Sequence, residues 1–312
     1  MDYFDDTASA GEERLKKELE LWSEARHGRV PPLVVLSRLG PIALGVGGLL
    51  KLVSGYRPPT PFTLFDSLPV WLAFVCSALP SAALAVLNRN LDSSAWESES
   101  LWGPLHPIDT CEPERRHAFV RYPMSAYSSH ALTAMGGLIL GHALRKGARA
   151  PMASGALGLS FLAMGLASFG WWASRRRRLH RIDNWLMETH LMAVGLAIGA
   201  ASEPEREGAM VIAWVCYALF RLAIFSGDAD LLVPSIGYWS ATLYAIARTG
   251  GGGELWRLVA GLCGVFGGLT VKMVDTTGKG AWGTAAFHYG TAIGWALFWS
   301  WSQTLPVPRA VG

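Results

Sequence analysis

Long apolar stretches constrain this chain more than any other feature. A helix needs roughly 20 mostly apolar residues to cross a bilayer core about 30 Å thick. Of the 312 residues, 51% are hydrophobic and 16% are charged, against about 25% charged in soluble domains. Nine windows of suitable length follow one another: Leu33–Val53, Leu64–Leu87, Tyr122–Leu144, Met152–Ser174, Asp183–Ala201, Ala209–Ser226, Leu231–Ala247, Leu255–Val274 and Ala281–Trp301. The sequence therefore predicts an all-α, multi-pass integral membrane protein.

Polar segments divide these windows into groups. We expect a polar head at 1–30, a two-span unit at 31–88, a polar connector at 89–120, a seven-span core at 121–303 and a tail at 304–312. The short connectors within the core are typical of antiparallel neighbouring helices. If the spans alternate, the basic residues of the head, of the segment Asn88–Arg121 and of the cluster 175–181 share one side, and the positive-inside rule then places the N-terminus in the cytosol. The arginine run is expected to contact lipid phosphates.

Charge and cysteine content exclude several classes of protein. A formal net charge of +3 gives no extended basic surface for nucleic acid. Four cysteines spread over 312 residues do not form a disulfide framework. A transporter is disfavoured because no inverted repeat is visible.

Ionisable residues inside the apolar windows are the candidate functional groups. Each costs about 2.5–3.5 kcal/mol at the centre of a membrane helix, so it marks a site or a pair by default. Helical spacing places His180, Asp183 and His190 on one stripe. We expect Arg221 to pair with a carboxylate such as Glu188, or to extend its charge to the interface.

Packing roles compete with functional roles at the histidines. His180 follows four arginines and is also explained as an interfacial residue, whereas His130 and His190 fit hydrogen-bonded packing residues as well as ligands. Asp183 and His288 have no opposite charge next to them in the sequence. Their partners must therefore come from other helices.

Four short motifs in this order resemble those of the alkaline ceramidases, seven-helix membrane hydrolases whose superfamily includes the adiponectin receptors. Residues 165–172 (GLASFGWW), followed by Asp183, are similar to a family pattern Gly-x-Gly-Ser-x-x-Phe-His with an Asp eleven residues after the His. Residues 109–112 (DTCE) resemble the start of the family's calcium loop, and 122–129 (YPMSAYSS) its Glu-Pro-x-Asn-Thr-x-Ser-Asn helix. Residues 284–294 resemble a pattern His-x-x-x-His followed by Thr-Ala-x-Gly. The resemblance covers about residues 105–303 and excludes the two N-terminal spans.

The resemblance implies a zinc-dependent amide hydrolase with Ser168, Asp183 and His288 at its catalytic site. In the family, three histidines hold the zinc, which lowers the pKa of a bound water so that it attacks an amide carbonyl. Here Trp172 and Thr284 stand at the positions of two of those histidines. An indole cannot bind zinc and a neutral hydroxyl binds it poorly, so two of three ligands are replaced.

The sequence remains compatible with two metal sites. His180 and His190 are available to rebuild a zinc site with His288. The calcium loop is degraded, yet the carboxylates of Asp109, Glu112 and Glu114 still offer oxygen ligands for weak calcium binding.

Two functional hypotheses follow from the resemblance. In the first, the inherited zinc amidase activity is lost or altered, and the protein is a metal-free acid–base enzyme or a lipid-binding protein in which the bulky Trp172 fills the metal position. In the second, a rebuilt zinc site cleaves the amide of a lipid. The resemblance implies that the partner is a membrane lipid or a lipid-like small molecule. It also implies an endomembrane such as the endoplasmic reticulum or Golgi if the source is eukaryotic.

Overall fold

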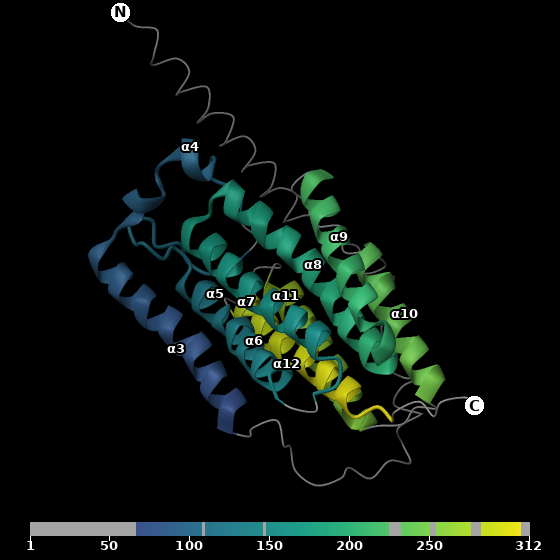
Figure 1. The fold of residues 1–312 in the computed structure, drawn as a ribbon. Helices are drawn as coiled ribbons and strands as arrows, with labels where there is room; N and C mark the ends of the chain where they lie inside the picture. The colour runs from purple at the N-terminus through teal and green to yellow at the C-terminus, as the bar shows by residue number, and fades with distance from the viewer. Residues whose placement is uncertain are drawn as a thin grey trace, which may run out of the picture. The chain divides into compact units, whose positions relative to one another are not determined.

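The computed structural model describes residues 67–107, 110–145, 148–224, 232–249, 254–275 and 282–306. Within these ranges the regular structure is helical and includes no β-strand, so the all-α prediction is confirmed there (Figure 1). The predicted head, the first predicted span and residues 307–312 of the predicted tail lie outside the described residues.

The helices follow the predicted windows in order. Their bounds are α3 Ser67–Asn90, α4 Glu99–Trp102, α5 Pro123–Ser128, α6 His130–Ala143, α7 Pro151–Ser174, α8 Arg177–Ser202, α9 Glu207–Ile224, α10 Leu232–Thr249, α11 Leu255–Asp275 and α12 Gly283–Gln303, with short 3-10 helices at Ser93–Trp96 and Pro204–Arg206. Helix α8 begins at Arg177 rather than at Asp183, because a helix can continue past the apolar boundary when its long basic side chains extend into water.

Three helices in the described ranges are long and apolar enough to cross a membrane. They are Pro151–Ser174, Pro204–Ile224 and Leu255–Met273. Their length and composition support the prediction of a membrane protein. The seven-span core stays a prediction.

The predicted span Tyr122–Leu144 is divided into two helices at Ser129. Pro123 starts α5 at a position where its missing N–H costs nothing. The hydroxyls of Ser128 and Ser129 then donate to the carbonyl of Ser125, at 2.9 and 3.2 Å. Such side-chain bonds compete with the helical ladder, and they place both hydroxyls beside α12.

The arginine run before α8 holds the polar connector in place. Arg175 Nε donates to the His106 carbonyl at 2.8 Å, and Arg176 and Arg178 donate to carbonyls of residues 103 and 101, at 3.0 and 2.8 Å. These three guanidiniums therefore bind protein carbonyls, a role that the sequence analysis did not assign to them.

Small residues allow close helix packing. Helices α11 and α12 meet through glycines, and a Cβ added at Gly290 would lie 2.5 Å from the carbonyl oxygen of Gly264. Helix α3 approaches α6 in the same way, since a Cβ at Gly137 would lie 2.7 Å from the carbonyl oxygen of Leu72. Such close contacts are typical of helices that associate inside a bilayer.

Helix α9 is attached to α8 by polar contacts. Arg221 donates from Nε and one terminal nitrogen to the two carboxylate oxygens of Glu188, at 2.8 and 2.9 Å. The indoles of Trp185 and Trp214 donate to backbone carbonyls across the same interface, at 3.1 and 2.8 Å. The predicted pairing of Arg221 with Glu188 is thus confirmed.

Candidate functional site

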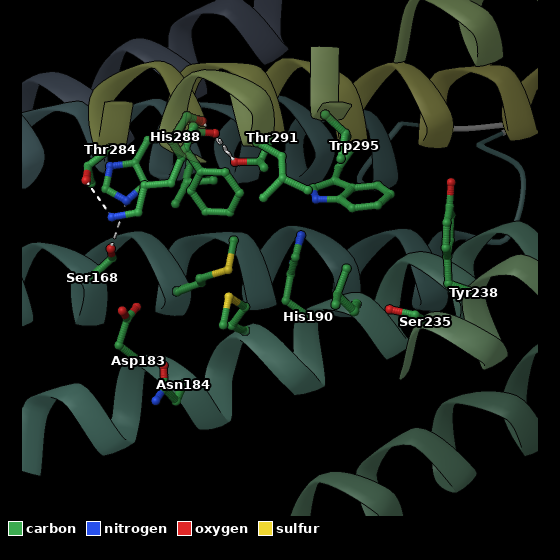
Figure 2. A pocket seen from close by; sticks show the side chains of 18 of the residues that line it. Ser168, Asp183, Asn184, His190, Ser235, Tyr238, Thr284, His288, Thr291 and Trp295 are labelled. Carbon is green, nitrogen blue, oxygen red and sulfur yellow. Dashed lines mark hydrogen bonds between the residues drawn. The ribbon is translucent and has the colours of Figure 1, made fainter. Parts of the chain in front are cut away.

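A cavity of about 370 Å³ lies among α7, α8, α10, α11 and α12. Its volume falls within the range of roughly 300–1,000 Å³ that small-molecule sites occupy. Polar side chains gather at one end, where Ser168, Asp183, Thr284 and His288 face one another in Figure 2. Aliphatic, aromatic and methionine side chains form most of the remaining wall, including Met164, Met187, Leu262, Val265, Phe266 and Phe298.

The three residues predicted to be catalytic meet at this polar end although they come from three helices. Ser168 of α7 places its Oγ 3.3 Å from Nε2 of His288 on α12. The Ser168 side chain is also hydrogen-bonded to the carboxyl group of Asp183 on α8, so the single proton of its hydroxyl has two acceptors within reach. Ser168 and His288 are 3% and 4% exposed, so the reactive atoms are screened from bulk solvent.

The orientation and proton position of His288 follow from its contacts with α5. Ser128 Oγ lies 2.8 Å from Nδ1 of His288, and the single proton of that hydroxyl goes to the Ser125 carbonyl at 2.9 Å. Nδ1 must therefore carry the ring proton and donate it to Ser128. Nε2 is left as an acceptor that faces the hydroxyl of Ser168.

The two replaced zinc-ligand positions also lie at this end. The ring centroid of Trp172 is 6.3 Å from that of His288, in an edge-to-face arrangement. Thr284 lines the cavity one turn before His288 on α12. Both side chains are buried, at 5% and 2% exposure.

Lys272 occupies the space between them and was missed by the sequence analysis. Its ammonium donates to Oγ1 of Thr284 at 2.9 Å and lies 5.1 Å from the ring centroid of Trp172. It also interacts electrostatically with Asp183 and His288. The sequence does show a lysine inside the window Leu255–Val274. A lysine in the last turn of a membrane helix ordinarily extends its ammonium to the membrane interface, so this position did not indicate a functional role.

The residues present do not fit a zinc ion. An ammonium group lies against the replaced positions 172 and 284, and it would repel a second cation. Among the described residues, no three His, Cys, Asp or Glu side chains gather in a group that could hold a metal. His180 packs on His106, with ring centroids 4.2 Å apart, while His190 contacts Ser160 through Nδ1 at 2.9 Å. The structure therefore gives no support to a rebuilt zinc site of His180, His190 and His288.

Two of the three carboxylates predicted to bind calcium have structural contacts instead. The Glu112 carboxylate accepts from the backbone N–H groups of residues 124 and 125, at 2.6 and 2.8 Å, and so caps α5. Glu114 forms ion pairs with Arg121 and Arg175, at 3.1 and 3.3 Å. Asp109 lies outside the described residues. The two visible carboxylates are thus committed to protein donors and do not fit a calcium ion.

His130 is a buried packing residue that does not line the cavity. Its ring stacks on Phe169 with centroids 5.5 Å apart, and it is 4% exposed. Packing therefore agrees with its position, but the predicted hydrogen bond is not formed, because neither ring nitrogen has a partner among the described residues.

Comparison with known proteins found no matching family model, no matching curated protein and no matching solved structure. The resemblance to the alkaline ceramidases therefore stays a prediction that rests on the four motifs.

Proposed function

We propose that this protein is a divergent, ceramidase-like membrane hydrolase that cleaves a lipid amide or ester without a metal. In this proposal Ser168 is the nucleophile, His288 is the general base and Lys272 stabilises the negative charge that develops on the substrate. The proposal retains the predicted seven-span core but replaces the metal chemistry of the family with chemistry supplied by side chains.

One observation carries the proposal. The hydroxyl of Ser168 faces the unprotonated Nε2 of His288, whose other nitrogen is held by Ser128. A nucleophile next to a base, with the base oriented by a third group, is the arrangement that activates serine for acyl transfer. The separation of 3.3 Å fits a free enzyme, because such contacts tighten when substrate binds.

The reaction follows from this arrangement. Ser168 Oγ attacks the carbonyl carbon of the lipid while its proton moves to Nε2 of His288. The resulting oxyanion is stabilised by the ammonium of Lys272. The tetrahedral adduct then breaks its bond to the leaving amine or alcohol, which takes the proton from His288. A water molecule, deprotonated by His288, next releases the fatty acid from Ser168 and restores the free hydroxyl.

Asp183 contributes charge to the same end of the cavity. In the free protein its carboxylate accepts the Ser168 hydroxyl proton, which must turn to Nε2 of His288 before the attack; the carboxylate then lies at the same end of the cavity as the imidazolium that forms during each step. Opposite charge stabilises that imidazolium. Asp183 and Lys272 therefore support the two charges of the transition state, the cationic ring and the anionic oxygen.

A long-chain lipid fits the cavity because its wall changes from polar to apolar along its length. The polar end offers a base, a hydroxyl and an ammonium to a carbonyl group, and the apolar wall offers methionine, leucine and phenylalanine to a chain. Three helices are apolar enough to span a membrane, which supports a membrane lipid as the ligand.

The alternative is lipid binding without catalysis. Trp172 favours it, because its buried ring occupies part of the polar end and leaves less room for a reacting group. The two functions differ in one property, which is whether Ser168 reacts covalently.

The test uses a fluorophosphonate probe and the detergent-purified full chain in the presence of a metal chelator. The probe transfers its phosphonyl group to an activated serine and releases fluoride. We expect labelling of Ser168, identified by peptide mass spectrometry, and hydrolysis of long-chain acyl esters or amides. Both are reduced about a thousandfold or more in Ser168→Ala. Ser174→Ala is the matched control, since Ser174 is a buried serine of α7 whose hydroxyl donates to the carbonyl of Gly170.

Lys272→Met tests the proposed oxyanion stabiliser. Methionine retains the length of the side chain and loses the charge, so we expect hydrolysis to fall by about a hundred- to a thousandfold. Lipid binding should persist. Saturable lipid binding with no labelling and no turnover in the wild type would establish the binding protein and refute the hydrolase.

A further inference from the structure

His190 presents an unused acceptor to the middle of the cavity. It lies on α8, and the separation of positions 183 and 190 places it about 10 Å beyond Asp183 along the helix axis. Figure 2 shows the side chain of His190 pointing toward α12, in the region of Thr291 and Trp295. The residue is 1% exposed, and its Nε2 has no hydrogen-bond partner within the described part of the chain.

The proton of His190 can be placed from its neighbours. Ser160 Oγ donates to the carbonyl of Leu157 at 2.7 Å and lies 2.9 Å from Nδ1 of His190. Because the hydroxyl has only one proton, Nδ1 must be the protonated nitrogen and must donate to Ser160. Nε2 is therefore an acceptor, and its hydrogen-bond partner must be a donor.

A lipid hydroxyl fits this position better than a water molecule does. A buried water typically needs two to four polar partners, and the wall around His190 is largely apolar, with the hydroxyls of Ser235, Tyr238 and Thr291 as its polar groups. The ring of Phe161 packs edge-on at 4.2 Å, and Leu191 and Trp295 line the adjacent wall. A donor carried by the bound lipid itself needs only the one acceptor that His190 offers.

The hydroxyl of Tyr238 supports this interpretation. It is buried, its side chain interacts with that of Thr242, and its ring packs against Trp295 and Phe298 with centroids 5.0 and 5.2 Å apart. A cavity built for an unsubstituted hydrocarbon chain would be more stable with phenylalanine at position 190, because a buried polar atom without a partner is costly. Both polar atoms belong to the half of the wall that lies away from Ser168 in Figure 2.

We propose that His190 binds a hydroxyl in the middle of the lipid's acyl chain, so that hydroxylated acyl lipids are the preferred ligands of this cavity. The position of that hydroxyl, about 10 Å from the reacting carbonyl, rests on the proposed function of Ser168 and Asp183. Recognition of the hydroxyl by His190 does not require turnover and is tested separately.

The experiment measures the binding of three free fatty acids to the detergent-purified full chain by displacement of a fluorescent fatty acid. 9-Hydroxystearic acid carries its hydroxyl eight carbon–carbon bonds from the carboxyl carbon, which matches the separation of about 10 Å along α8. Stearic acid lacks this hydroxyl, and 9-methoxystearic acid keeps the oxygen without the proton. We expect the wild type to bind 9-hydroxystearic acid about five- to tenfold more tightly than either of the others. Free fatty acids have no bond for the protein to hydrolyse. Their binding therefore tests the preference whether or not the protein is a hydrolase.

Two variants assign the preference to His190. His190→Phe removes the acceptor and should bind the three acids equally. Ser160→Ala leaves the imidazole intact but removes the partner of Nδ1, so the ring proton can move to Nε2 and the preference should shift toward the methyl ether. Equal binding of all three acids by the wild type, or a preference that survives in His190→Phe, would overturn the proposal. If His190→Phe does not fold, a preference unchanged in Ser160→Ala would overturn it equally.

Discussion

The ion pair between α8 and α9 leads to a quantitative prediction. Glu188 is fully buried and accepts two charged hydrogen bonds from Arg221, whose side chain is 18% exposed. Each such bond contributes about 1.5–3 kcal/mol. Removing one partner of a buried pair costs about 3–5 kcal/mol, because the other charge stays behind without compensation. We therefore expect Glu188→Leu and Arg221→Leu each to lower the free energy of unfolding by that amount.

The double variant separates the ion pair from simple packing. With both charges gone, the two leucines can pack across the interface, and replacing a buried pair by apolar residues is often neutral or stabilising. The free energy of unfolding of the double variant should return to within about 1 kcal/mol of the wild type. The coupling energy from the mutant cycle would then be several kcal/mol.

Equilibrium unfolding in mixed detergent micelles, followed by tryptophan fluorescence, measures these differences. Arg206→Leu is the control, since Arg206 is 69% exposed and its ion pair with Glu203 should contribute about 0–1 kcal/mol. If the losses from the two single substitutions simply add in the double variant, the pair does not hold α9 to α8 and the reasoning is wrong.

Two further predictions concern packing and pH. Gly290→Ala should lower the free energy of unfolding by about 1–3 kcal/mol, because its new methyl group would press against the backbone of Gly264, whereas Gly267→Ala, which meets no atom within 4 Å, should be tolerated. The hydrogen bond from the Tyr244 hydroxyl lowers the pKa of Glu203 below its usual range. Glu203 therefore stabilises the fold at neutral pH, and this contribution is lost as the pH falls through the lowered pKa. The Tm of Glu203→Gln should therefore be lower than that of the wild type at neutral pH, and the difference should shrink in acid. A difference that does not change with pH would contradict this assignment.

Much of the helical framework could be predicted because the physical signal is strong. A run of about 20 apolar residues bounded by charge has few alternatives to a membrane helix. The break between α5 and α6 was not predictable, since it depends on where the hydroxyls of Ser128 and Ser129 find acceptors. The pairing of Arg221 with Glu188 was predictable, because a buried charge requires an opposite charge and few carboxylates lie inside the apolar windows.

The candidate site was predicted in part. Motif spacing placed Ser168, Asp183 and His288 in one site, and the structure shows them lining one cavity. The tautomer of His288 depends on a contact between α5 and α12, which no pattern within one helix reveals. Lys272 was missed for a related reason, because its ammonium turns inward to Thr284 only when α12 is in place.

The contacts of Lys272 agree with the absence of histidine at positions 172 and 284. An ammonium is held well by a hydroxyl acceptor and by the face of an indole, and Thr284 and Trp172 supply these two contacts. The same two side chains bind zinc poorly or not at all. If the proposed kinship with the ceramidases is right, the lysine ammonium lies where the family holds its metal.

This explanation makes a prediction about restoring the metal. Trp172→His together with Thr284→His returns two imidazoles beside His288, but the retained ammonium of Lys272 would repel Zn²⁺ by several kcal/mol at a separation of about 4 Å. We therefore expect the double variant to bind little zinc, and the triple variant with Lys272→Met to bind one zinc per chain, measured by elemental analysis after dialysis in detergent. Stoichiometric zinc in the double variant would show that Lys272 does not occupy the metal position. A triple variant that folds but binds no zinc would show that positions 172, 284 and 288 do not converge as the resemblance implies.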